Sequence, residues 1–151
     1  MTRLAITVAI AFSALAAAPA RAGDLRTVDG ERVDMDSPAL LVFWSLEDGE
    51  IGLRHAAHLA DSGARVVAVN TDDASRKSEV RAFAVVRAPQ VDVVNDAGAR
   101  LQRQVRASDN DAVVIGTDGA VVWRTNQLER NTAQALTIAS MHGATAAVAG
   151  R

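Results

Sequence analysis

The stretch ALLVFWSLEDGEIG, residues 39–52, decides the frame of the fold. It opens with a continuous apolar run that closes at Ser45, and such a run is typical of a strand covered on both faces. Acidic and glycine residues follow at once, and from Gly49 to Ser62 the apolar positions take helical spacing. We therefore expect a buried strand, a short turn at its carboxyl end, and a helix.

The remaining apolar segments predict the rest of the sheet. Residues 64–70 and 91–94 have the apolar character of strands, and a helical segment precedes each of them. Residues 112–116 and 120–124 flank a Thr-Asp-Gly turn and predict an antiparallel hairpin. Strands that alternate with helices pair in parallel, so the sequence predicts an α/β fold: a central mixed β-sheet flanked by helices.

Turn and capping signals predict features near both ends of this unit. Asp29-Gly30, inside the alternating segment DLRTVDGERVDMD, predicts an N-terminal β-hairpin. Further on, Asn126 and Glu129 have the spacing of a capping box, which predicts that the last helix begins there.

The first 22 residues have the pattern of a signal peptide. Arg3 gives a positive start, an apolar segment follows, and residues 20–22 (Ala-Arg-Ala) form a small-x-small cleavage signal. The apolar segment is short for a bilayer span. We expect a cleaved signal peptide over residues 1–22, export to the periplasm or the medium, and no stable membrane anchor. A domain over residues 23–142 and an Ala-rich flexible tail over 143–151 would remain.

Composition argues against several classes of function. The chain has no cysteine, so it has no thiol nucleophile, no thiolate metal ligand and no dithiol. Aromatic residues make up 3% of the chain, which argues against stacking on nucleic acid bases. Removing Arg3 and Arg21 with the signal peptide leaves 14 Lys and Arg against 18 Asp and Glu, a formal net charge of −4. A nucleic acid partner is therefore not expected.

Four stretches, taken in order, carry a resemblance to a known group of proteins: LLVFWSLEDGEIG, ARVVAVNTDD, APQVDVVNDAGARLQRQV and AVVIGTDGAVVWR. Their order and spacing resemble the thioredoxin-like superfamily, closest to the exported TlpA-like thioredoxins and their peroxiredoxin relatives. The resemblance covers roughly Leu25 to Met141. It implies a thioredoxin-like fold, with the site of the family at the turn that follows the first buried strand.

The site positions of that family hold different residues in this chain. Asp48 and Ile51 stand where the family has Cys-x-x-Cys, and Asn110 stands at about the position of its cis-proline. Without proline we expect a trans peptide bond there, since a cis bond costs ~2.5–4 kcal/mol. The resemblance therefore implies the fold without disulfide chemistry: a redox-inactive protein with no catalytic residue and no cofactor.

A binding role is the main functional hypothesis. Relatives receive extended polypeptide in the groove beside the dithiol, so we expect an exported protein or peptide as the partner. The residues expected to contact it surround the turn: Trp44, Glu47, Asp48 and Asn110. The plainer interpretation of the acidic residues is that they stabilise the start of a helix, and core packing is an alternative role for Trp44.

Metal handling is the second hypothesis. His55 and His58 stand three residues apart on the predicted helix, as two ligands of copper or zinc could, and the acidic turn precedes them. The alternative is that both histidines lie on a solvated flank of the helix, because apolar residues already occupy its inner stripe.

Overall fold

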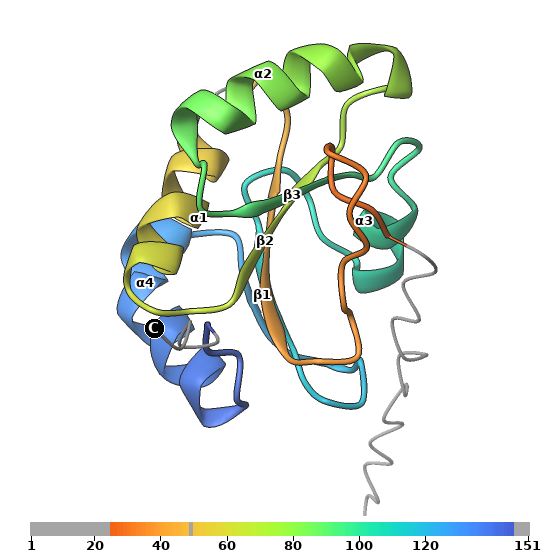
Figure 1. Ribbon diagram of the computed structural model, residues 1–151. Helices are drawn as coiled ribbons and strands as arrows, with labels where there is room; N and C mark the ends of the chain where they lie inside the picture. Colours follow the sequence, from red (N-terminus) through yellow and green to blue (C-terminus); the bar gives the residue numbers. More distant parts are fainter. Residues whose placement is uncertain (1–24, 49, 147–151) are drawn as a thin grey trace, which may run out of the picture.

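The computed structural model describes residues 25–48 and 50–146, so the expected signal peptide and the last five residues of the expected tail lie outside the described part. The helices and strands follow one another as shown in Figure 1. In chain order they are β1 (Ala39–Trp44), α1 (Glu50–Asp61), β2 (Val66–Asn70), the 3₁₀ helix η1 (Ala74–Arg76), α2 (Lys77–Arg87), β3 (Asp92–Asn95), α3 (Arg100–Val105), β4 (Ala112–Ile115), β5 (Val121–Thr125) and α4 (Leu128–Met141).

Five strands form one mixed sheet in the order β3-β2-β1-β4-β5. The β1–β2 and β2–β3 pairs are parallel, whereas β4 is antiparallel to both β1 and β5. Because β1, β2 and β3 run the same way, their last residues meet at one edge, where Trp44 pairs with Asn70 and Asn70 with Asn95. We call this the carboxyl edge of the sheet. The predicted mixed sheet flanked by helices is confirmed.

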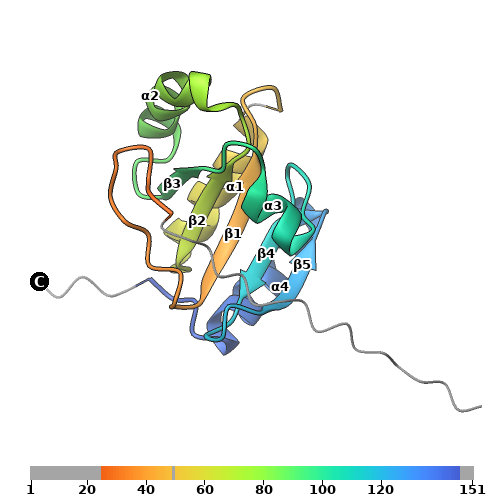
Figure 2. The ribbon, with the colours of Figure 1, turned by 90° about the vertical axis from the view of Figure 1, so that its right-hand side faces the viewer.

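Helices cover both faces of the sheet (Figures 1 and 2). On one face α1, α2 and α4 pack around Trp44, with Leu53 of α1 among the buried contacts. On the other face α3 packs Leu101 into a cluster with Phe43. Every residue of β1 is buried, as the continuous apolar run predicts. Burying one large apolar side chain stabilises the fold by roughly 1.5–3 kcal/mol. β1 therefore contributes strongly to the stability of the core.

The N-terminal β-hairpin is not confirmed. A turn forms at the predicted place, with Gly30 at a φ of +94°, and an isolated bridge and two backbone hydrogen bonds join its arms, but neither arm forms a strand. The segment also pairs with the sheet: Thr27 bridges to Val94, and the N–H of Val28 donates to the carbonyl of Val93 at 2.8 Å. We call residues 25–33 the strap. Through Thr27 and Val28, the strap lies along the outer edge of β3.

The start of the expected flexible tail is packed against the domain. Ala144 is fully buried, Thr145 forms an isolated bridge with Ala64, and the N–H of Ala146 donates to the carbonyl of Gly63 at 2.9 Å. The prediction of a flexible tail is thus wrong for residues 143–146. The positive φ of Gly143, +77°, turns the chain back toward the end of α1.

The last helix begins without the predicted capping box. α4 starts at Leu128, and its N-cap residue Gln127 makes no side-chain cap hydrogen bond. Thr125 organises this junction instead, since its Oγ1 accepts from the N–H of Gln127 at 3.0 Å and from Nδ2 of Asn131 at 2.8 Å. Across residues 25–48 and 50–146, no helix has both the length and the apolar character to cross a bilayer.

Candidate functional site

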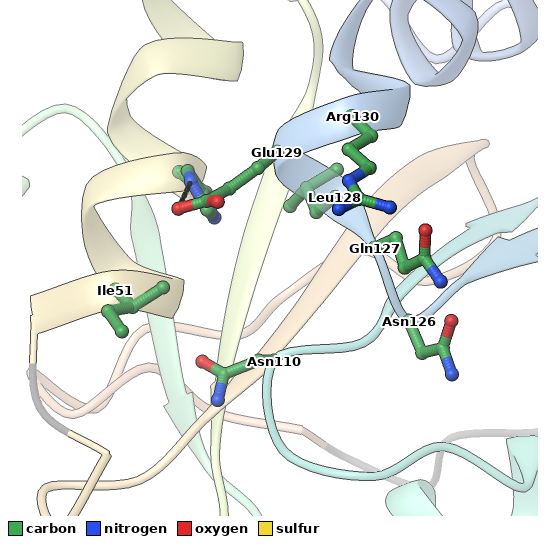
Figure 3. A pocket seen from close by; sticks show the side chains of 8 residues that line it. Ile51, Asn110, Asn126, Gln127, Leu128, Glu129 and Arg130 are labelled. Carbon is green, nitrogen blue, oxygen red and sulfur yellow. Dashed lines mark ion pairs between the residues drawn. The ribbon is translucent and has the colours of Figure 1, made fainter.

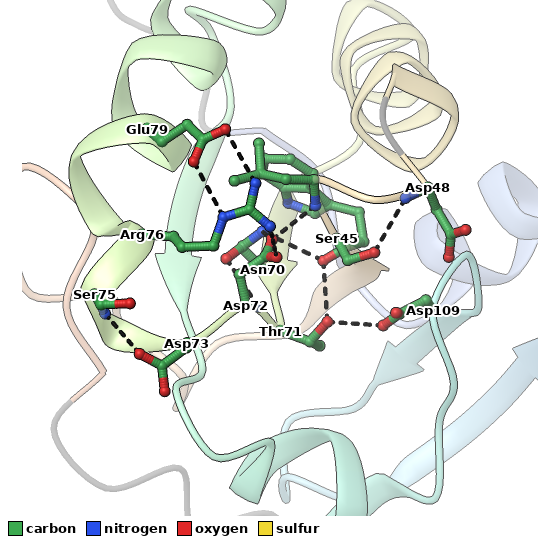
Figure 4. Close-up of polar contacts among 12 residues, drawn as sticks. Ser45, Asp48, Asn70, Thr71, Asp72, Asp73, Ser75, Arg76, Glu79 and Asp109 are labelled. Carbon is green, nitrogen blue, oxygen red and sulfur yellow. Dashed lines mark hydrogen bonds and ion pairs between the residues drawn. The ribbon is translucent and has the colours of Figure 1, made fainter.

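The turn after β1 is held by the side chains of Ser45, directly after β1, and of Asp72, in the loop after β2 (Figure 4). The N–H of Leu46 donates to Oδ2 of Asp72 at 2.7 Å, and the N–H of Asp48 donates to Oγ of Ser45 at 3.3 Å. Glu47 and Asp48 are exposed. The turn thus presents its acidic side chains to solvent from a backbone that is held in place.

Asn70, Asp72, Arg76 and Asn95 form a polar cluster under this turn, which we call the carboxyl-edge cluster. Asn70 is fully buried, donates to Asp72 at 2.7 Å and accepts from Asn95 at 2.8 Å. Arg76 pairs with Asp72 at 3.0 Å and with Glu79 at 3.0 Å. This cluster was not predicted from the sequence. The signal was that two successive parallel strands both end in Asn.

The loop before β4 faces the turn across the carboxyl edge. Asp109 accepts from Thr71 at 2.8 Å and from Gln102 at 3.0 Å, and the N–H of Asn110 donates to the carbonyl of Phe43 at 2.8 Å. The structure therefore ties this loop to β1, β2 and α3.

Asn110 occupies the expected place opposite Asp48. Its Nδ2 lies 3.5 Å from Oδ2 of Asp48, so these two predicted site residues do come together. No cis peptide bond occurs among the described residues, which agrees with the trans bond expected at Asn110. The residue has a φ of +67°, in the left-handed region that asparagine tolerates better than most residues. Its Oδ1 is buried without a hydrogen-bond partner.

A pocket of about 420 Å³ opens beside Asn110, between the start of α1 and the junction of β5 with α4 (Figure 3). We call it the α1–α4 pocket. Its lining residues come from three separate segments of the chain: Ile51, His55, Asn110, Asn126, Gln127, Leu128, Glu129 and Arg130. Two of the three predicted site positions, Ile51 and Asn110, line it. The residues from 126 to 130 were not predicted, because their approach to α1 joins segments far apart in sequence.

His55 faces this pocket and pairs with α4. Its Nε2 lies 3.8 Å from Oε1 of Glu129, and its side chain is 16% exposed. Burial lowers the pKa of His55 below its ordinary value of 6.5; Glu129 opposes this effect, while Arg54 and His58 add to it. The imidazole is therefore mainly neutral at pH 7. The expectation of a solvated flank is wrong for His55, although His58 is exposed.

Trp44 does not belong to the exposed surface of this site. Its side chain is fully buried, and its ring stacks on Phe83 with centroids 6.0 Å apart. Trp44 therefore supports the turn from the core, and the structure corrects its place among the residues expected to contact a partner. Its Nε1 has no hydrogen-bond partner among the described residues.

The structure does not assemble the proposed metal ligands into a centre. Among the described residues, no three His, Cys, Asp or Glu side chains gather closely enough to hold a metal ion. Nε2 of His55 lies 3.8 Å from Oε1 of Glu129, and these two residues gather no third ligand from the described part of the chain. The metal-handling alternative gains no support from this arrangement.

A parallel β1–β2–β3 unit, an antiparallel β4–β5 hairpin and a turn–helix junction opposite the loop before β4 define the class: the chain has a thioredoxin-like fold, and it holds no cysteine. No protein-family model matches the sequence, and no curated protein matches it.

Solved structures of this fold resemble the chain closely in shape and weakly in sequence. A secreted disulfide oxidoreductase of Mycobacterium tuberculosis, homologous to E. coli DsbE, matches with a TM-score of 0.60 and 15% identity over 76% of this chain and 93% of its own. StoA from Bacillus subtilis matches with a TM-score of 0.59 and 18% identity over 77% and 98%. A thioredoxin-like protein from Aeropyrum pernix has a TM-score of 0.53 and 15% identity over 73% and 86%. The resemblance to the thioredoxin-like superfamily is thereby confirmed for the fold.

Proposed function

We propose that this chain is an exported, redox-inactive thioredoxin-fold protein that binds an extended protein or peptide segment in the α1–α4 pocket. The observation that carries the proposal is the position of that pocket. It opens directly beside Ile51 and Asn110, which stand where the family has its second cysteine and its cis-proline. In relatives, this is the region that receives extended polypeptide. The binding surface is thus retained where the redox groups are absent.

The chemistry of the pocket favours binding over catalysis. Its lining includes no serine, threonine, cysteine or lysine that could act as a nucleophile. The imidazole of His55 and the carboxylate of Glu129, which could exchange protons with a ligand, lie beside each other instead, with Nε2 3.8 Å from Oε1. Ile51, a large apolar side chain that is 43% exposed, supplies a surface that gains free energy when a partner covers it. Noncovalent recognition is what these groups can perform.

Export is supported by two independent lines. The first 22 residues have the positive, apolar and small-x-small order of a signal peptide. One of the proteins of similar fold, from Mycobacterium tuberculosis, is described as secreted. Fusion of residues 1–30 to a reporter that is active only outside the cytoplasm tests this part, and a fusion that stays intracellular and uncleaved contradicts it.

Selection from a random peptide library tests the binding function. The exported chain is immobilised and challenged with a phage-displayed library, and Ile51→Glu serves as the matched variant because it places a charge on the apolar wall. We expect families of peptides that bind the wild-type chain and lose about tenfold or more in affinity for Ile51→Glu, equal to ~1.4 kcal/mol. The control Val122→Glu, at a residue 38% exposed on β5, leaves affinity unchanged. A library without enriched sequences contradicts the proposal.

A further inference from the structure

We propose that the α1–α4 pocket takes an uncharged, extended peptide, whose main-chain amides bind the side-chain amides of Asn126 and Gln127 while an aliphatic side chain lies between Ile51 and Leu128. This inference rests on the peptide-binding function proposed above. It adds the chemical class of the peptide and names the groups that recognise it.

Several backbone groups around the pocket are already hydrogen-bonded. The N–H of Asn110 donates to the carbonyl of Phe43 at 2.8 Å, and the N–H of Gln127 donates to Oγ1 of Thr125 at 3.0 Å. The carbonyl of Gln127 already accepts from the N–H of Arg130 at 3.1 Å. These three groups are not available to a ligand, so the exposed side chains of the pocket and the N–H groups at the uncapped start of α4 remain for polar recognition.

The side chains of Asn126 and Gln127 are suited to that task. Both residues are exposed, and neither side-chain amide forms a hydrogen bond to another described residue. Each amide carries donors and an acceptor, the same complement as a peptide group, so it can pair with a main-chain N–H and C=O. Figure 3 shows the two amides beside each other at one end of the pocket, with Ile51 toward the other end.

The charges of the pocket balance, which favours a neutral ligand. Glu129 and Arg130 carry opposite charges, and burial keeps His55 mainly neutral at pH 7 by lowering its pKa. A charged ligand side chain would therefore meet no net opposite charge while losing hydration. An aliphatic side chain would instead cover Ile51 and reach Leu128, at roughly 25 cal/mol for each Å² of apolar surface removed from water.

Three matched peptides test the inference. They are blocked heptapeptides of glycine, serine and valine that differ only in a central leucine, lysine or glutamate, titrated into the exported chain and followed by amide NMR shifts. We expect the leucine peptide to bind about fivefold or more tightly than the other two, a difference of ~1 kcal/mol. Methylating the main-chain nitrogens beside the leucine removes the paired donors and weakens binding about tenfold.

The double variant Asn126→Ala/Gln127→Ala tests the amides from the side of the protein. It should bind the leucine peptide about tenfold more weakly. Gln134→Ala, which removes an exposed amide from α4 outside the pocket, should bind as the wild type does. Amide NMR spectra of both variants establish that they fold.

The outcomes separate this inference from the function on which it rests. Equal binding of the three central residues, or unchanged binding in the double variant, overturns the inference and leaves peptide binding intact. If none of the three probes binds, the library sequences decide. Enriched peptides whose aliphatic residue covers Ile51 support the inference, and enriched peptides with a charged residue at that place overturn it. A library with no enriched sequence removes both proposals.

Discussion

At the residue scale, Gly52 lies where α1 packs tightly against β1. A Cβ at this position would lie 2.7 Å from Cβ of Trp44 and 3.1 Å from the carbonyl oxygen of Phe43. Both neighbours belong to the buried central strand, so neither can move away at low cost. Because glycine has no side chain, Gly52 allows α1 to pack directly on β1.

Gly52→Ala should destabilise the protein in spite of the better helix propensity of alanine. Propensity favours alanine by about 1 kcal/mol, whereas overpacking against Trp44 costs about 1–3 kcal/mol. Since α1 and β1 would have to separate, we expect a net loss of stability in urea unfolding. A variant as stable as the wild type, or more stable, would show that the contact at Gly52 relaxes easily.

Asp72 is the residue on which the shape of the turn depends. Its Oδ2 accepts from the N–H of Leu46 at 2.7 Å and from Nδ2 of Asn70 at 2.7 Å. Asp72→Asn replaces one carboxylate oxygen with a donor, so either Leu46 and Asn70 lose their acceptor at Oδ2 or Arg76 loses its acceptor at Oδ1. We expect a loss of about 1–3 kcal/mol, the usual cost of an unsatisfied buried donor.

The measurement for Asp72→Asn is chemical unfolding together with hydrogen exchange at the amide of Leu46, which should become faster. Asp73→Asn is the matched control, because Asp73 is exposed and its Oδ1 accepts from the N–H of Ser75, within the same short segment, at 2.9 Å. Equal losses in the two variants would argue against a special role for Asp72.

His55 gives the protein a predictable dependence on pH. Burial lowers its pKa in the folded state, so folding favours the neutral imidazole. The stability that this group contributes is fully present above the unfolded-state pKa near 6.5 and is lost as the pH falls through that value toward the lower folded pKa. Wild-type stability should therefore decline between pH 7 and pH 5, and His55→Gln should decline less.

Glu129→Gln tests the same assignment from the opposite direction. The carboxylate of Glu129 raises the pKa of His55 against the effect of burial. Removing that charge should lower the pKa of His55 further, as an NMR titration of the imidazole protons would show. An unchanged or raised pKa would mean that the 3.8 Å pair does not persist in solution.

At the scale of elements, the two edges of the sheet are protected by different means. The strap covers the edge of β3, with the N–H of Val28 donating to Val93 and with Val28 itself buried. On the opposite edge, β5 pairs with β4 across an irregular register between Val114 and Ile115. Exposed edge strands invite pairing between molecules, and bulges and covering segments are the common protection.

Val28→Asp should therefore both destabilise the fold and uncover β3. Burying a carboxylate in place of an apolar side chain costs about 2–4 kcal/mol, because the carboxylate loses its hydration and gains no partner in the core. We expect a lower unfolding midpoint and self-association detected by light scattering. Val122→Asp on β5, where the side chain is already 38% exposed, is the control and should have a smaller effect.

At the scale of the whole molecule, the sequence predicts what depends on local pattern. The continuous apolar run at residues 39–44 could be placed as a buried strand, and the Thr-Asp-Gly turn as the tip of the late hairpin. The positions of Asp48 and Asn110 followed from the resemblance, and they lie together. Each of these inferences needs only periodicity, turn chemistry or order along the chain.

What escaped prediction depends on contacts between distant segments. The approach of Glu129 to His55 joins α4 to α1, and no local pattern announces it. The strap resembled a hairpin because its turn is real, but its arms form no strands, and Thr27 and Val28 pair with the edge of β3. Both features depend on tertiary contacts, which local sequence patterns do not specify.

The double variant Asp48→Cys/Ile51→Cys tests whether the frame of the family site persists without its chemistry. Asp48 lies in the turn and Ile51 in the first turn of α1, and a disulfide between these positions requires Cβ atoms ~3.5–4.5 Å apart. The free N–H groups and the dipole at the start of α1 favour a thiolate, whereas Glu47 opposes it. We expect a disulfide on mild oxidation and one thiol with a pKa below ~8.5. Thiol counting and thiolate absorbance against pH provide the measurement. Two ordinary thiols that never pair would mean that the turn has departed from the family geometry as well as from its chemistry.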